Sequence, residues 1–193
     1  PHWTWPGREG EVTPVFVYTN YPTAELFING KSYGKQSKNN SSLKSRYRLM
    51  WMDAVYEPGE VKVVAYNKDG KAVAEKTVRT AGKPHHIELV SNRNELTADG
   101  KDLAYVTVKV VDKDSNLCPT DSRLIHFSVK GAGKFRAVAN GDPTNLEQFH
   151  LPKMHAFHGM LTAIVQAGEI AGDLVLTAKA SGVKTGTVHL QAK

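Results

Sequence analysis

The feature that most constrains this chain is an alternation of apolar and polar residues with a period of two, interrupted at short intervals by turn residues. Residues 103–111 (LAYVTVKVV) give the clearest example, and residues 61–66 (VKVVAY) repeat it. Successive side chains of a β-strand point to opposite faces, so this pattern predicts half-buried strands. No stretch carries a convincing 3.6-residue apolar period over three turns, and we therefore expect an all-β fold.

Turn signals separate the predicted strands. Asn29-Gly30 follows the strand 24–28, and Asp69-Gly70 follows the strand 61–66. Both dipeptides are typical of tight hairpins, in which both central residues adopt positive φ. Further strands are expected over residues 123–130, 134–139, 159–167, 174–180 and 185–191. Many short strands at a spacing of roughly 8–12 residues indicate antiparallel sandwiches.

Gly and Pro break the strand pattern at residues 80–84, and a new strand pattern starts at His85. We place a domain boundary there, which predicts one domain over residues 1–82 and a second over 83–193. Each length suits an immunoglobulin-like β-sandwich of about 100 residues. The fold expected from the sequence is therefore two tandem immunoglobulin-like β-sandwich domains.

Composition and charge argue against several classes of function. The net charge of +6 is modest, and the basic residues between 31 and 48 fit a solvated loop better than a nucleic-acid surface. Unbroken aliphatic runs last only a few residues, far short of a membrane span. Cys118 is the single cysteine, so the chain forms no internal disulfide. Gly131 to Lys134 lacks the spacing of a phosphate-binding loop, and we predict no cofactor.

Catalytic and metal sites are not indicated by the remaining motifs. No acidic residue is marked as buried, and no Gly-x-Ser-x-Gly is present. Residues 112–116 (DKDSN) alternate oxygen ligands but lack the Gly and Glu of a calcium loop. His150, His155 and His158 lie near Asp142 in sequence, yet on a strand residues 155 and 158 would point to opposite faces. We interpret them as loop histidines and predict no metal site.

The chain opens on an aromatic segment that contains His2, Trp3 and Trp5. On a strand the two tryptophans would share a face and form a flat platform for a sugar ring. Alternatively, they pack against a preceding domain, since aromatic residues are enriched at interface centres. A start on Pro rather than Met favours a piece of a longer protein over a processed mature chain.

Several motifs together resemble those of one enzyme family. They cover nearly the whole chain in the order that the family has them. The matching segments are residues 2–5 (HWTW), 24–34 (AELFINGKSYG), 56–61 (YEPGEV), 140–144 (NGDPT) and 156–159 (AFHG). The chain resembles the C-terminal domains of bacterial β-galactosidases of glycoside hydrolase family 2.

This resemblance implies the non-catalytic C-terminal accessory region of a larger retaining β-galactosidase, in which the acid/base and nucleophile glutamates lie on a barrel domain. No position here matches them. The implied partners are the catalytic barrel of the same polypeptide and galactose-containing glycans, and the implied location is the periplasm or surface of a bacterium. Residues 140–159 are expected to form a long loop that faces another domain or a ligand, with Asn140, Asp142 and the three histidines as its candidate contact residues. Two alternatives stay open: a carbohydrate-binding module and an adhesion-type spacer.

Overall fold

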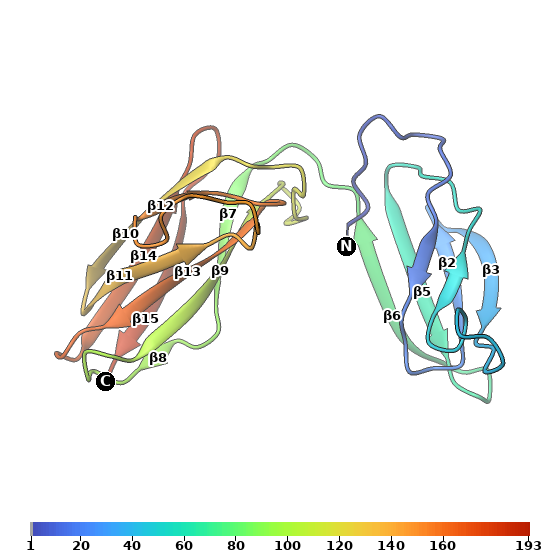
Figure 1. The fold of residues 1–193 in the computed structure, drawn as a ribbon, viewed down its shortest axis with the longest axis horizontal. Coiled ribbons are helices and arrows are strands. Elements are labelled where there is room, and N and C mark those ends of the chain that lie inside the picture. Colours follow the sequence, from blue (N-terminus) through green and yellow to red (C-terminus); the bar gives the residue numbers. More distant parts are fainter. Residues whose placement is uncertain (1) are drawn as a thin grey trace. The chain divides into compact units, whose positions relative to one another are not determined.

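The computed structural model describes residues 2–193, which form strands β1 to β15 and contain no helix. This confirms the all-β prediction. Two compact units share the chain, residues 1–80 and 81–193, and each is a β-sandwich of the immunoglobulin-like kind (Figure 1). The division lies inside the Gly/Pro break at 80–84, two residues before the boundary drawn from the sequence. Among residues 2–193 there is no helix long and apolar enough to cross a membrane.

The first unit packs a four-stranded antiparallel sheet, in the order β3-β2-β5-β6, against the two-stranded sheet β1-β4. Its strands are β1 (Val15–Val17), β2 (Thr23–Ile28), β3 (Lys31–Ser37), β4 (Leu49–Trp51), β5 (Glu60–Tyr66) and β6 (Ala72–Arg79). The alternation in β2 does what the sequence predicted: Ala24, Leu26 and Ile28 are buried on one face.

The two predicted hairpin turns have different geometries. Asn29 and Gly30 both adopt positive φ, at 48° and 80°, which confirms a tight two-residue turn. At Asp69-Gly70 only Gly70 has positive φ, at 76°, so the prediction of two positive φ angles was wrong there. The side chain of Asn67 accepts hydrogen bonds from the backbone N–H groups of Asp69 and Lys71, and these bonds stabilise a longer turn.

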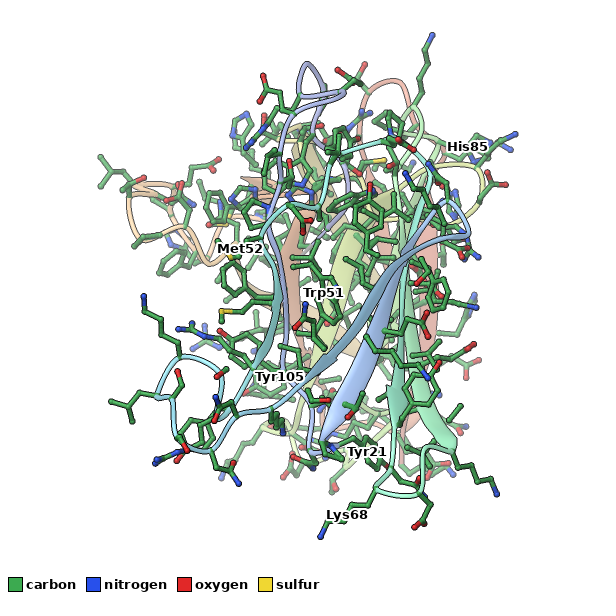
Figure 2. The ribbon with its side chains drawn as sticks, turned by 90° about the vertical axis from the view of Figure 1, so that its right-hand side faces the viewer. Tyr21, Trp51, Met52, Lys68, His85 and Tyr105 are labelled. Carbon is green, nitrogen blue, oxygen red and sulfur yellow. The ribbon has the colours of Figure 1, made fainter. Side chains whose placement is uncertain are left out.

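Aromatic side chains fill much of the core of the first unit. Trp51 is 1% exposed, and its Nε1 donates a hydrogen bond to the carbonyl of Gly34 at 3.0 Å. Figure 2 shows Trp51 among the strands of this unit, whereas Lys68 lies in the loop that ends β5. An indole N–H needs a partner when it is buried, and the carbonyl of Gly34 supplies it.

The second unit packs the five-stranded sheet β12-β10-β14-β15-β8 against the four-stranded sheet β11-β13-β9-β7. Its strands are β7 (His86–Ser91), β8 (Glu95–Leu96), β9 (Leu103–Val111), β10 (Leu124–Gly131), β11 (Gly133–Ala139), β12 (Lys153–His155), β13 (Met160–Ala167), β14 (Gly172–Lys179) and β15 (Gly186–Ala192). The long strands β9, β13 and β14 alternate buried and less buried residues along most of their length. Their inward side chains are mostly Val, Leu and Ala, which make an aliphatic core.

Candidate functional site

The N-terminal aromatic segment is not a strand, and its two tryptophans differ in environment. Trp3 is 4% exposed and belongs to the core of the first unit. Its Nε1 donates to the carbonyl of Glu57 at 3.0 Å, and its ring meets the edge of Tyr56 at 5.2 Å between centroids. Trp3 therefore anchors this segment to its own unit and does not share an exposed face with Trp5.

Trp5 is half-buried and forms the accessible part of the segment together with His2. The two rings lie 4.3 Å apart between centroids and are tilted by 40°. The hydroxyl of Tyr56 accepts a hydrogen bond from the backbone N–H of Trp5 at 3.1 Å, which fixes the main chain here. The aromatic surface expected from the sequence thus consists of His2 and Trp5, with Trp3 beneath it in the core.

The stretch 140–159 is not one continuous loop, because it contains β12 and a tight turn. β12 pairs antiparallel with β10. His158 and Gly159 then adopt φ of 51° and 73°, and Phe157 and Met160 exchange both backbone hydrogen bonds across them. This is the geometry of a two-residue hairpin turn, which His-Gly does not signal as clearly as Asn-Gly. The irregular loop is confined to residues 140–152.

The histidines of this stretch do not converge. Nδ1 of His155 lies 3.1 Å from a carboxylate oxygen of Glu147, and Nδ1 of His158 lies 3.3 Å from the carbonyl of Pro119. His150 is exposed in the irregular loop. Within residues 2–193, no three or more His, Cys, Asp or Glu side chains gather as a metal-binding group.

Asn140 and Asp142 brace the start of the irregular loop. Nδ2 of Asn140 donates to the carbonyl of His155 at 3.0 Å, and its Oδ1 accepts from the backbone N–H of Asp142 at 3.1 Å. The carboxylate of Asp142 accepts from the N–H and the hydroxyl of Thr144. Those bonds, and the nearby charge of His158, lower the pKa of Asp142. The sequence marked both residues as contact candidates, and each makes hydrogen bonds within its own unit.

Two exposed apolar side chains at this loop were not singled out from the sequence. Leu146 is 96% exposed and Phe149 is 56% exposed. Both lie in the irregular part of the stretch, which has no period-two alternation from which their exposure could be predicted.

Asp112 is a buried carboxylate that the sequence pattern did not reveal. It is 2% exposed and accepts hydrogen bonds from the backbone N–H groups of Gly82, Asp114 and Asn116 at 2.7–2.9 Å. Burial alone would raise the pKa of Asp112, but these bonds, together with one from Nδ2 of Asn116, outweigh burial and lower it. Because its oxygens already accept protein N–H donors, Asp112 organises the turn 112–116 and stabilises the start of the second unit.

The other carboxyl groups with a displaced pKa also favour the ionised form. The bond from the hydroxyl of Ser32 lowers the pKa of Glu25, and backbone N–H donors lower those of Asp99 and Asp102. A glycosidase general acid needs a raised pKa instead. None of these groups, nor Asp112 and Asp142, therefore suits that role.

Cys118 is buried in the second unit, and burial raises the pKa of its thiol to about 11. A catalytic thiol needs the opposite shift, because the thiolate is the nucleophile. Cys118 therefore packs as a small core residue, close to the turn at Gly159, where an added Cβ would lie 2.2 Å from the carbonyl oxygen of Cys118.

Comparison with known proteins gives the same picture over both units. Glycoside hydrolase family 2 C-terminal domain 5 matches residues 87–189, and Domain of unknown function (DUF4982) matches residues 10–74. Beta-galactosidase BoGH2A of Bacteroides ovatus is 41% identical over 194 residues, which cover 100% of this chain and 22% of the relative. A putative β-glucuronidase of Formosa agariphila is 32% identical over 144 residues, or 74% of this chain and 14% of the relative.

Among solved structures, a β-glycosidase from Bacteroides vulgatus matches with a TM-score of 0.92 and 30% identity, over 100% of this chain and 24% of that chain. The chain thus spans less than a quarter of the length of these relatives. The family model covers more than half of the chain, and the motifs that run through both units agree with it. The chain belongs to glycoside hydrolase family 2.

Proposed function

We propose that this chain is a non-catalytic accessory region that stabilises the catalytic barrel of a β-galactosidase, as part of the same polypeptide. The observation that carries the proposal is the 41% identity with the Bacteroides ovatus β-galactosidase, which runs through the whole chain yet spans 22% of that enzyme. An accessory role also agrees with the chemistry of the chain. Its displaced carboxyl groups are held ionised by hydrogen bonds, and its thiol is held protonated by burial.

The test compares the full-length polypeptide with a version that lacks residues 1–193. Deletion should lower the temperature at which activity on a chromogenic β-galactoside is lost and leave KM for that substrate nearly unchanged. The chain alone should hydrolyse nothing. An unchanged inactivation temperature would contradict the stabilising role and favour a spacer. A parallel assay with a β-glucuronide decides the substrate class, since relatives of both names match.

A second candidate function is carbohydrate binding, and the half-buried ring of Trp5, in contact with the ring of His2, favours it. Titration calorimetry of the chain with galactose, lactose and a galactan tests this role. Saturable binding that Trp5→Ala abolishes would support it, with Tyr47→Ala as a control for loss of an exposed aromatic ring. Trp3→Ala is not suitable, because Trp3 lies in the core and its removal would unfold the unit.

A further inference from the structure

The two-stranded sheet β1-β4 is apolar on both faces. Its inner face carries Leu49 and Trp51, which are buried in the core. Its outer face carries Phe16, which pairs with Met50 across the strands. We define the outer β1-β4 face as the side chains that alternate outward along these two segments: Val12, Phe16, Tyr18, Arg48, Met50 and Met52.

The outer β1-β4 face is exposed in this structure. Phe16 is 44% exposed, Tyr18 70% and Met52 56%. Trp51 and Met52 are adjacent in sequence but point to opposite sides of the sheet. Figure 2 shows Trp51 inside the unit and Met52 at its surface. Arg48 lies with its guanidinium 5.7 Å from the ring centroid of Phe16. Strands that are apolar on both faces are typical of sheets covered on both sides.

The opposite sheet of the same unit has a different surface. On it, Lys35 lies 4.1 Å from the ring centroid of Tyr66, and the hydroxyl of Tyr66 donates to Glu25. Arg79 forms an ion pair with Glu60 at 2.6 Å. Charged side chains thus cover the β3-β2-β5-β6 sheet, whereas the outer β1-β4 face combines Phe, Tyr, Met and Arg. That combination is the one enriched at protein–protein interfaces.

We propose that the outer β1-β4 face is the surface by which the first unit docks on the catalytic barrel of the same polypeptide. This inference rests on the proposed accessory function. Asp53 is the carboxylate nearest in sequence to Arg48 and its basic neighbours Lys44 and Arg46. None of the ion pairs among the described residues involves these three cations. The surface of the barrel that contacts this face should be apolar at its centre and carry carboxylates at its rim, where they would pair with the basic side chains.

Two other occupants fit the face less well. A second copy of this chain would bring the basic residues of two identical faces together, since a two-fold interface pairs a patch with itself. A sugar needs several hydrogen-bond donors and acceptors beside the aromatic rings. Among the side chains of this face, only the hydroxyl of Tyr18 and the guanidinium of Arg48 are strong hydrogen-bonding groups. A partner protein surface of opposite charge satisfies both the apolar and the basic side chains.

Oxidative footprinting tests the proposal, because Met and Tyr side chains report their own accessibility. The chain alone and the full-length polypeptide are exposed to hydroxyl radicals, and modification is read by mass spectrometry. We expect Tyr18 and Met52 to be at least about fivefold less modified in the full-length polypeptide, as for residues at the core of an interface. Tyr66, on the opposite sheet, and Tyr105, in the second unit, serve as the controls and should not change.

A matched pair of substitutions gives an independent readout. In the full-length polypeptide, Phe16→Ser should lower the inactivation temperature, whereas Val73→Ser, at a 39% exposed position on β6, should not. Tryptophan fluorescence of the chain alone checks that both variants still fold.

The outcomes separate this inference from the proposed function. Protection of Tyr18 and Met52 with unchanged controls supports docking through this face. Equal modification in both samples contradicts docking through this face, even if deletion of the chain still destabilises the enzyme. Protection that appears in the chain alone as its concentration rises overturns the barrel as occupant in favour of a second copy. If deletion leaves the enzyme unaffected, the accessory function itself fails and the docking proposal fails with it.

Discussion

The two units are sandwiches with differently built cores. In the first unit three buried aromatic residues, Trp3, Trp51 and Tyr56, pack with aliphatic ones. The core of the second unit is mostly Val, Leu, Ile and Ala, and Phe127 is its one buried aromatic residue among those that the structure describes. The first unit depends on a sheet whose strands β1 and β4 have three residues each, whereas β9 in the second has nine.

The difference shows how short strands compensate for their length. A three-residue strand directs only one or two side chains inward, so a large ring must supply the buried area that several aliphatic side chains supply elsewhere. A ring with an N–H group also needs a partner, and Trp3 and Trp51 each donate to a backbone carbonyl. Stability is therefore concentrated in few residues of the first unit and spread over many in the second.

The largest expected effect is that of Trp51→Ala. Truncation of a buried tryptophan costs about 3–5 kcal/mol of unfolding free energy, and we expect the first unit to lose most of its stability. All tryptophans lie in the first unit and the single cysteine lies in the second. Urea denaturation followed by fluorescence of Trp3 and Trp5 reports the first unit, and thiol reactivity of Cys118 reports the second.

Leu176→Ala, at a fully buried position of β14, is the matched variant for the second unit. It should cost about 2–5 kcal/mol and shift only the thiol transition. If Trp51→Ala and Leu176→Ala each move both transitions equally, the two units unfold as one cooperative system. That result would contradict the view that each core stabilises its own unit.

A smaller loss is expected from Asp112→Ala. Removal of the carboxylate leaves the N–H groups of Gly82, Asp114 and Asn116 without their acceptor, at a cost of about 3 kcal/mol to the second unit. Asp114→Ala, in the same turn but exposed, should change stability by less than about 0.5 kcal/mol. Equal effects of the two substitutions would show that the buried hydrogen bonds of Asp112 add nothing to the unfolding free energy of the second unit.

Low pH should destabilise the two units to different extents. The pKa values of Asp99, Asp102, Asp112 and Asp142 are lowered in the folded second unit, whereas Glu25 is the one such carboxyl resolved in the described part of the first unit. A lowered pKa stabilises the folded state above the unfolded value, about 3.9 for Asp. That contribution is lost as pH falls through the folded value.

Below about pH 4 the urea midpoint of the second unit should therefore decrease more steeply than that of the first. The same two probes, measured at several pH values down to pH 2, check this. A steeper decrease in the tryptophan signal would contradict it. Asp112→Ala should flatten the pH dependence of the second unit and leave that of the first unchanged.

The smallest expected effect is at the surface of the first unit. Lys35→Gln removes the cation beside the ring of Tyr66 and should cost about 0.5–1 kcal/mol. Lys71→Gln, in the turn after β5, is the control and should leave the fluorescence midpoint unchanged within about 0.5 kcal/mol. A cost that persists in high salt would favour packing of the lysine stem over charge as its origin.

Local periodicity predicted most of the fold. The strands over 103–111 and 24–28 were predicted with their bounds or nearly so, because apolar alternation is written in consecutive residues. The turn at His158-Gly159 was missed, because His-Gly is a weaker hairpin signal than Asn-Gly or Asp-Gly. Strand β12, which divides the candidate loop, was also missed, because three residues are too few to show an alternation pattern.

The environments of single residues were harder to predict, because their partners lie far away in sequence. Trp3 is buried by contacts with Tyr56 and Glu57, more than 50 residues along the chain. The buried carboxylate of Asp112 accepts a hydrogen bond from the backbone N–H of Gly82, 30 residues before it. An alternation pattern indicates that a residue faces inward or outward, but it carries no information on which distant group will meet it.

Trp3 has one more consequence, for the order of events during synthesis. Its Nε1 bonds to Glu57, and its own carbonyl accepts a hydrogen bond from the hydroxyl of Thr80, at the other end of the first unit. Chains emerge from the ribosome N-terminus first, at about 5–20 residues per second. Trp3 must therefore wait several seconds after it is synthesised, while the rest of the first unit is made, for the contact with Thr80.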